Sequence, residues 1–281
     1  MKIAITGASG HLGTAIIKEA TKKLGTSGII GITRTPEKAK HLGIEIRKAD
    51  YNSREEYTEA LKDIEVLLII SGNDMPEKRS RQHRNVIGAA KTTGIRKIVY
   101  SSIIGEPGKC AFDDIILSNR QTEKDIMISG LEWSIGRNGL YLEPDLDSLP
   151  VYFKEGKISN CAGNGKCPYT VRSELAVAYV RMITDNKHNN QVYNLSDEPI
   201  TQKQLVNAIN EVYGSHLMFL NISPEEYLAN RIAVHGEILG SIVGGIYDGI
   251  SKGTFDVIPD FEKAAGRRHT AVIDFIRENK K

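Results

Sequence analysis

The feature that most constrains the fold lies at the start of the chain, where an apolar run leads through three glycines into a helical pattern. Residues 2–6 read KIAIT, Gly7, Gly10 and Gly13 follow at intervals of three, and LGTAIIKEA begins at residue 12. Glycine lets a backbone turn tightly and approach a pyrophosphate, and the first turn of a helix offers unpaired N–H groups. This strand–turn–helix unit predicts a dinucleotide-binding Rossmann fold.

Short β-branched runs alternate with helical patterns through the first half of the chain. The predicted strands are residues 2–6, 28–33, 45–48, 65–70, 97–101 and 132–137. The predicted helices lie near residues 11–24, 36–42, 53–62, 77–94 and 113–129. This alternation is typical of an α/β protein whose doubly wound parallel sheet is covered by helices on both faces.

The rhythm changes after residue 137. Residues 138–156 contain prolines, acids and aromatics without a clear period, which predicts a loop or a small substrate-side segment. Further helical patterns follow at residues 170–184, with Ser173 as the expected N-cap, at 201–214 and at 223–234, and one more strand at 191–196. We therefore expect a Rossmann domain over residues 1–138, completed by about 168–196, and a smaller C-terminal α+β substrate subdomain over 139–167 and 197–281.

Charge, hydropathy and cysteine content argue against several classes of partner. The net charge of +2 gives no reason to expect nucleic acid, and the most basic stretch, Lys78–Arg84, is interpreted as a solvated helix face. Apolar runs such as Val66–Ile70 have the length of a strand and not of a membrane span. The 3 cysteines fit a reducing cytoplasm, and Cys161 and Cys167 match no common zinc pattern. We expect a cytoplasmic protein with no metal and no membrane partner.

A glycine-rich apolar segment near the end of the chain, residues 236–253, reads GEILGSIVGGIYDGISKG. We interpret it as a helix that packs against the core or against another subunit, so a homodimer is left open. Asp248 and Lys252 within it argue against a role in lipid binding.

The end of the second predicted strand indicates which nicotinamide cofactor is preferred. NAD-specific folds usually place Asp or Glu about 20 residues beyond the glycines, to bond the ribose 2′-hydroxyl. Thr33 and Arg34 stand there instead, and Lys38 follows one helical turn later. An arginine can pair with a 2′-phosphate through its planar fork. Both cations could equally be ordinary surface charges, but NADP(H) is favoured over NAD(H).

Polar residues at the ends of other predicted strands extend this site, because those ends face the ligand crevice of an open α/β sheet. Asp50 and Tyr51 follow the third strand and could meet the adenine, although Asp50 could also be a turn residue. Ser71 and Gly72 follow the fourth strand and Ser101 ends the fifth. Whether the serines contact the ligand or cap loops stays open.

A set of motifs in fixed order resembles the NmrA-like atypical short-chain dehydrogenase/reductases, and within them the branch of bacterial quinone and triphenylmethane reductases. The motifs are TGASGHLG, ITRTPEKA, KADY, LLIISG, QHRNVIGAAKTTGIRKIVYSS, GRNGLY, AGNGK, VRSELAVA, VYNLS and YDGISKGTF. The resemblance implies a Rossmann domain, a preference for NADPH, and a cleft between the domains for aromatic acceptors.

The resemblance also implies roles for individual residues, with Asn138 and Tyr141 near the nicotinamide or the substrate. The complete predicted cofactor set is Gly7, Ser9, Gly10, His11, Leu12, Gly13, Arg34, Lys38, Asp50, Tyr51, Ser71, Gly72, Ser101 and Asn138.

Proton transfer is where the chain departs from related enzymes. Many short-chain reductases use Tyr-x-x-x-Lys, in which the lysine lowers the pKa of the tyrosine, and no tyrosine here has a lysine at that offset. In the resembling enzymes a lysine or histidine stands four residues before a helix glutamate. With Glu123 as that glutamate, the position holds Asn119, which can orient a group but cannot exchange a proton near neutral pH. Asn119 and Tyr141 are the candidate catalytic residues, and His83 and Tyr100 are interpreted as structural.

Two classes of function follow. The first is an NADPH-dependent reductase that passes hydride to a quinone-like or other conjugated aromatic acceptor, which is electrophilic enough to react without a strong acid. The second is an NADP(H)-binding, redox-sensing regulatory protein of NmrA type that has no turnover.

Overall fold

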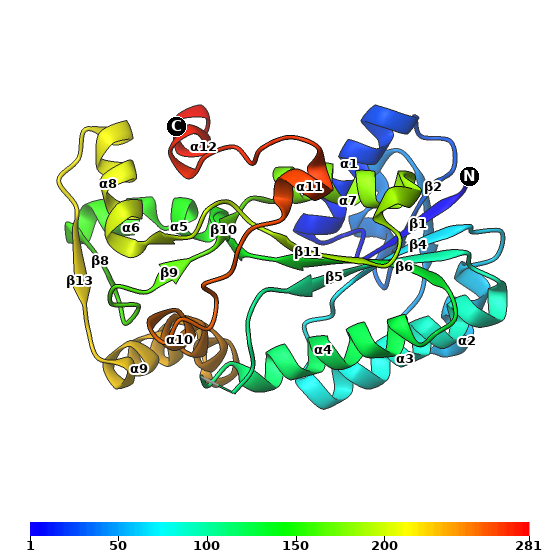
Figure 1. The fold of residues 1–281 in the computed structure, drawn as a ribbon, viewed down its shortest axis with the longest axis horizontal. Coiled ribbons are helices and arrows are strands. Elements are labelled where there is room, and N and C mark those ends of the chain that lie inside the picture. Colours follow the sequence, from blue (N-terminus) through cyan, green and yellow to red (C-terminus); the bar gives the residue numbers. More distant parts are fainter. Residues whose placement is uncertain (109, 281) are drawn as a thin grey trace.

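The structure of residues 1–108 and 110–280, described by a computed structural model, is built on a seven-stranded sheet with helices on both faces (Figure 1). The strand order is β11-β6-β5-β4-β1-β2-β3 and all neighbours are parallel. The strands are β1 (Ile3–Thr6), β2 (Ile29–Thr33), β3 (Glu45–Lys48), β4 (Val66–Ile70), β5 (Lys97–Ile103), β6 (Glu132–Asn138) and β11 (Gln191–Leu195). The predicted doubly wound Rossmann sheet is confirmed.

Two helical layers enclose this sheet and explain why its central strands are continuously apolar. One face carries α1 (His11–Leu24), α7 (Arg172–Thr184) and α11 (Phe261–Ala265). The other carries α2 (Arg54–Ala60), α3 (Pro76–Thr93) and α4 (Asp113–Met127). Every residue of β1 and β2 is buried, as expected for parallel strands covered on both faces.

The smaller part of the molecule lies at one end of the sheet, on the left of Figure 1, around a third apolar cluster that includes Tyr169, Leu205 and Tyr247. Its helices are α5 (Glu143–Asp147), α6 (Leu149–Glu155), α8 (Gln202–Tyr213), α9 (Pro224–His235), α10 (Glu237–Ser251) and α12 (Val272–Glu278). Its strands are β7 (Leu140–Tyr141), β8 (Lys157–Asn160), β9 (Lys166–Cys167), β10 (Tyr169–Thr170), β12 (Ile200–Thr201) and β13 (Met218–Asn221). The glycine-rich helix α10 packs against α9.

Three local predictions were wrong, each for a physical reason. Residues 36–42 form two short 3₁₀ turns, Pro36–Lys38 and Lys40–Leu42, because so short a segment cannot offset the cost of nucleating an α-helix. Of the two alternatives for residues 138–156, the loop is wrong, because these residues form β7, α5 and α6, and elements this short carry no readable period. Val171, and not Ser173, is the N-cap of α7.

The predicted division into domains meets one difference. Helix α11 falls in the range expected for the substrate subdomain, yet Phe261 and Ala264 pack in the same cluster as Tyr179 of α7. The chain therefore returns to the sheet at α11 and then passes back to the smaller part, where α12 lies (Figure 1).

Three further features concern partners and metals. No helix in the described chain is both long and apolar enough to cross a membrane. Cys110, Cys161 and Cys167 are free thiols. The described residues contain no group of three or more His, Cys, Asp or Glu side chains that could hold a metal.

Candidate functional site

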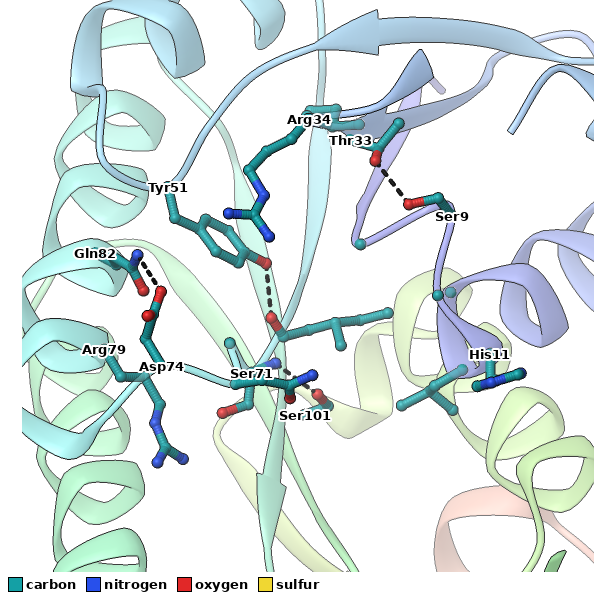
Figure 2. Close-up of a pocket in the computed structure, with 18 of the residues that line it drawn as sticks. Ser9, His11, Thr33, Arg34, Tyr51, Ser71, Asp74, Arg79, Gln82 and Ser101 are labelled. Atoms are coloured by element: carbon teal, nitrogen blue, oxygen red, sulfur yellow. Dashed lines mark hydrogen bonds between the residues drawn. The ribbon is translucent and has the colours of Figure 1, made fainter. Parts of the chain in front are cut away.

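A cavity of about 860 Å³ opens at the carboxyl ends of the parallel strands (Figure 2). This volume is within the range of about 300–1,000 Å³ that is usual for ligand and cofactor sites. Tyr141 lines the cavity, as does the whole predicted cofactor set: Gly7, Ser9, Gly10, His11, Leu12, Gly13, Arg34, Lys38, Asp50, Tyr51, Ser71, Gly72, Ser101 and Asn138. Asn119 is not part of its wall.

The glycine turn between β1 and α1 has the geometry of a phosphate cradle. Gly7 has φ +61°, and a Cβ on Gly13 would lie 2.2 Å from the carbonyl oxygen of Gly7, so α1 crosses the turn at a distance that only glycine allows. Helix α1 begins at His11 after the N-cap Gly10, and no side chain caps it. The N–H groups of its first turn therefore face the cavity without a protein partner, which fits a dinucleotide pyrophosphate.

The end of β2 carries a cation and hydroxyl groups and no acid. The side chain of Arg34 is 69% exposed and lies 3.9 Å from the Asp50 carboxylate. Ser9 Oγ and Thr33 Oγ1 are hydrogen-bonded at 2.8 Å on the same wall (Figure 2). An exposed guanidinium beside two hydroxyls suits a ribose 2′-phosphate better than a bare 2′-hydroxyl.

Tyr51 is held against the strand ends by its phenol. The hydroxyl donates to the carbonyl of Ile70 at 2.6 Å and lies 2.6 Å from Thr6 Oγ1. Its ring stacks on Tyr57 with centroids 5.4 Å apart. The aromatic wall expected near the adenine is therefore rigid. Asp50 is a turn residue, since its Oδ1 accepts from the Asn52 backbone N–H at 2.8 Å, and it also lines the cavity. Its contact with the adenine stays a prediction.

Beyond the glycine turn, Ser71 and Ser101 meet at the ends of β4 and β5. The backbone N–H of Ser71 donates to Ser101 Oγ at 3.0 Å. Asn119 Oδ1 accepts from the Ser71 hydroxyl at 3.1 Å and from the Tyr100 hydroxyl at 2.8 Å, while its amide donates to the Ile115 carbonyl. Asn119 is fully buried and thus reaches the cavity only through Ser71. Tyr100 is buried as predicted, and burial raises its pKa to about 12.

Asn138 and Tyr141 form the side of the cavity next to the smaller part of the molecule. Tyr179 donates to Asn138 Oδ1 at 2.6 Å, which fixes the amide, and Asn138 Nδ2 then donates to the Tyr141 hydroxyl at 3.2 Å. The Arg172 guanidinium lies 5.1 Å from the centre of the Tyr141 ring. Burial raises the pKa of Tyr141, so its phenol is a weak proton donor at neutral pH.

His83 has the structural role expected of it. It is fully buried, its Nε2 accepts from the Gly72 backbone N–H at 3.0 Å, and its Nδ1 lies 2.9 Å from Thr122 Oγ1. Burial lowers its pKa to about 3, which keeps the ring neutral. The neutral ring holds the turn after β4.

The interpretation of Lys78–Arg84 as a solvated face was wrong for its middle. Arg79, Gln82 and His83 are buried, and Arg79 and Gln82 line the cavity. Sequence reasoning missed these two residues. The sequence signal that could have found them is the helical spacing of Arg79, His83 and Val86, which puts these residues on the core side of one helix.

Comparison with known proteins agrees with this geometry. A family described as NAD(P)H-binding matches residues 7–158. Quinone oxidoreductase 2 of Escherichia coli (strain K12) is 34% identical over 281 residues, covering 98% of this chain and 97% of that one. An NmrA-like family domain-containing oxidoreductase of Aspergillus flavus is 31% identical over 240 residues, covering 81% and 76%. The chain belongs to the NAD(P)H-binding, NmrA-like oxidoreductase family.

A solved structure of the same kind is triphenylmethane reductase of Citrobacter sp. complexed with NADP(H). It superimposes with a TM-score of 0.90 at 30% identity and covers 99% of each chain. The family membership confirms the predicted resemblance, the fold and the class of cofactor. The glycine cradle is where an NAD(P)H-binding protein of this family would hold the pyrophosphate.

Proposed function

We propose that this protein is an NADPH-dependent reductase whose acceptor is a quinone or another conjugated aromatic molecule. The observation that carries the proposal is a single cavity that joins the glycine cradle and Arg34 at one end to Asn138 and Tyr141 at the other. The names of two relatives, a quinone oxidoreductase and a triphenylmethane reductase, support an aromatic acceptor.

The preference for NADPH rests on the end of β2. Bound there, the cofactor would supply hydride, and this chain would supply the binding and the orientation. Arg34 and Lys38 line the cavity and bring positive charge to the place of the 2′-phosphate. No acidic residue ends this strand to favour the 2′-hydroxyl of NAD(H).

The class of acceptor follows from the weak proton donors at the other end. Asn119 cannot exchange a proton near neutral pH, and Tyr141 has a raised pKa. We infer that Asn119 positions Ser71 and that Tyr141 contacts the ligand. A quinone becomes a stabilised phenolate on reduction and needs little acid catalysis, whereas a simple ketone becomes a basic alkoxide that must be protonated.

The test is NADPH oxidation with a panel of one neutral quinone, one cationic triphenylmethane dye and one unconjugated ketone. We expect the quinone to be reduced, the ketone to give no rate above background, and NADH to be a poorer donor than NADPH. Tight NADPH binding without reduction of any acceptor would overturn the proposed activity.

A second candidate is an NADP(H)-dependent redox sensor without turnover. The buried Asn119, at a position where related enzymes have a proton carrier, favours it. A sensor must distinguish the two redox states of its cofactor. Titration with NADP⁺ and NADPH tests this directly, and equal affinities for the two forms would remove this candidate.

We further propose a cytoplasmic location, supported by the three free cysteines. A homodimer stays a prediction, which light scattering of the purified protein can check.

A further inference from the structure

One charged side chain of the cavity has no part in the cofactor site described above. Arg79, on α3, is only 5% exposed and lines the cavity. Its Nε has no hydrogen-bond partner, and no ion pair joins its guanidinium to another described residue. Burial lowers its pKa from the ordinary value. Because an uncompensated buried cation is unfavourable, a ligand with negative charge would stabilise it.

The carboxylate whose charge acts on Arg79 is Asp74, and it forms no ion pair with Arg79 because it binds other groups. Asp74 accepts from Lys78 Nζ at 3.0 Å and from Gln82 Nε2 at 2.7 Å. Asp74 is therefore shared with these groups and compensates the charge of Arg79 only in part, so an anionic ligand would stabilise the guanidinium further.

The position of Arg79 in the fold assigns it to the acceptor half of the cavity. Helix α3 follows β4, which lies between β1 and β5 in the sheet, whereas β2 with Arg34 lies on the other side of β1. Figure 2 shows Arg79 near Asp74 and Gln82, on the Tyr51 side of the pocket and across from His11. The charge of Arg79 also acts on the phenol of Tyr100, on the neighbouring strand β5. A dinucleotide that runs from β2 across β1 would bring its nicotinamide, and the acceptor over it, toward this side.

Two neutral hydroxyls at the ends of β4 and β5 are already committed. Ser71 and Tyr100 both donate their hydroxyl protons to Asn119 Oδ1. Neither proton is available to an acceptor oxygen without breaking that bond. The N–H groups of Arg79 are charged donors and have no such commitment.

We propose that Arg79 determines acceptor specificity: its guanidinium binds an oxygen of a quinone and stabilises the negative charge that this oxygen gains on reduction. This inference rests on the proposed function. The quinone takes up hydride from NADPH, which is oxidised to NADP⁺, and the resulting hydroquinone monoanion takes its second proton from water. Arg79 keeps its own protons throughout.

The same charge disfavours a cationic acceptor. Two positive groups close together in a site with little water repel each other strongly, and such repulsion is a common source of specificity. The cavity should therefore accept neutral quinones more readily than cationic dyes.

The kinetic test compares Arg79→Met, Arg79→Lys and the control Arg81→Met, which removes the same charge from an exposed position of the same helix. We expect Arg79→Met to lower kcat/KM for a neutral quinone roughly ten- to a hundredfold, as for the loss of one charged oxyanion donor. It should raise kcat/KM for a cationic triphenylmethane dye. Arg79→Lys should lie between, and Arg81→Met should match the unaltered protein.

The binding test needs no turnover. 4-Nitrophenol, whose phenolate absorbs visible light, is titrated near its own pKa in the presence of NADP⁺. The unaltered protein should bind the phenolate and increase its absorbance, and Arg79→Met should lose this signal with an unchanged Kd for NADPH. Two controls test for misfolding: the melting temperature of each variant, and the Arg79→Lys variant, which preserves the charge.

Each result decides between the two proposals. If quinone is reduced and Arg79→Met leaves both acceptors and phenolate binding unchanged, the inference on Arg79 is wrong. A weaker Kd for NADPH in Arg79→Met, with the ratio of quinone to dye rates unchanged, would assign Arg79 to a cofactor phosphate and also overturn it. If no acceptor is reduced but phenolate binds through Arg79, the proposed function fails and the anion site stands.

Discussion

Two arginines line one cavity, and their surroundings differ. The side chain of Arg34, at the cofactor end, is 69% exposed with Asp50 at 3.9 Å. Arg79, which we assign to the acceptor end, is 5% exposed and has no ion-pair partner among the described residues. Water and salt screen the first charge, so it can only add selectivity to a site that glycines already shape. The second acts in a drier environment, where one charge has a larger effect on the ligand.

The two ends are also assembled differently. The phosphate cradle comes from one continuous segment, β1 and α1 with the turn between them. The acceptor end combines β4, α3, β5, α4 and β6, which are consecutive in the sequence but extend from residue 66 to residue 138. A substitution in the phosphate cradle should therefore have a local and large effect on cofactor binding. A substitution at the acceptor end should act through several hydrogen bonds that depend on one another.

The largest effect is expected at the cradle. In Gly13→Ala the new Cβ would lie 2.2 Å from the Gly7 carbonyl oxygen, a backbone atom that cannot move aside, while in Gly10→Ala the same oxygen would be 3.3 Å away. Overpacking costs up to about 3 kcal/mol, which corresponds to roughly a hundredfold weaker NADPH binding in Gly13→Ala. The loss of NADPH affinity in Gly10→Ala should be far smaller. Fluorescence titration of both variants measures this, and equal losses would show that the close approach does not shape the site.

The second effect concerns the exposed cation. Arg34→Ala should weaken NADPH binding roughly ten- to a hundredfold, since hydrogen bonds to charged groups contribute about 1.5–3 kcal/mol, and it should barely change NADH binding. Lys38→Ala is the matched control and should have a smaller effect because Lys38 is exposed and lies one turn away. Equal weakening of NADPH and NADH by Arg34→Ala would place this side chain away from the 2′-phosphate.

The third prediction concerns the pH dependence of stability that His83, next to the turn after β4, should cause. His83 has a folded-state pKa of about 3, below the usual 6.5. As the pH falls, the unfolded chain therefore binds a proton at His83 before the folded protein does. Stability should then fall as the pH drops below about 6.5, by up to about 1.4 kcal/mol per pH unit for this group.

Urea unfolding of the unaltered protein and of His83→Gln between pH 7 and 5 measures that slope. The free energy of unfolding of His83→Gln should decrease less between pH 7 and 5 than that of the unaltered protein. His188→Gln is a comparison variant, because burial also lowers the pKa of His188, to about 4, while its ring contacts Tyr193 and not the turn after β4. It should reduce the loss of stability in acid without affecting the turn after β4. An unchanged slope in His83→Gln would mean that His83 takes up its proton in the folded protein near its ordinary pKa, and that its burial does not disfavour the charge.

The smallest effect compares the two arginines directly. Replacing the buried, unpaired Arg79 by Met should leave the protein as stable or stabilise it by about 1 kcal/mol, because a buried charge is exchanged for an apolar chain of similar length. Arg34→Met should change the melting temperature little. Thermal unfolding of both variants checks this, and a large loss of stability in Arg79→Met would show that Arg79 supports the fold.

Much of the cofactor end could be predicted because its residues are neighbours in the sequence. Glycine spacing, a strand before it and a helix after it are local signals, and each strand end of a parallel sheet points to the same edge. The acceptor end offered no such signal. Arg79 stands in a stretch rich in basic residues, and only the orientation of α3 over β4 decides that Arg79 and Gln82 turn inward while Arg81 and Arg84 face water.

By itself, the sequence determined the order of the strands in the main sheet, the glycine cradle and the cation at the end of β2, because periodicity and backbone freedom act over a few residues. The tertiary structure decided what the acceptor end contains. It buried Asn119 behind Ser71, gave His83 a bond to Gly72, and left Arg79 in the cavity without a described ion-pair partner. These contacts join residues that lie between 11 and 48 positions apart, and only packing of the helices on the sheet brings them together.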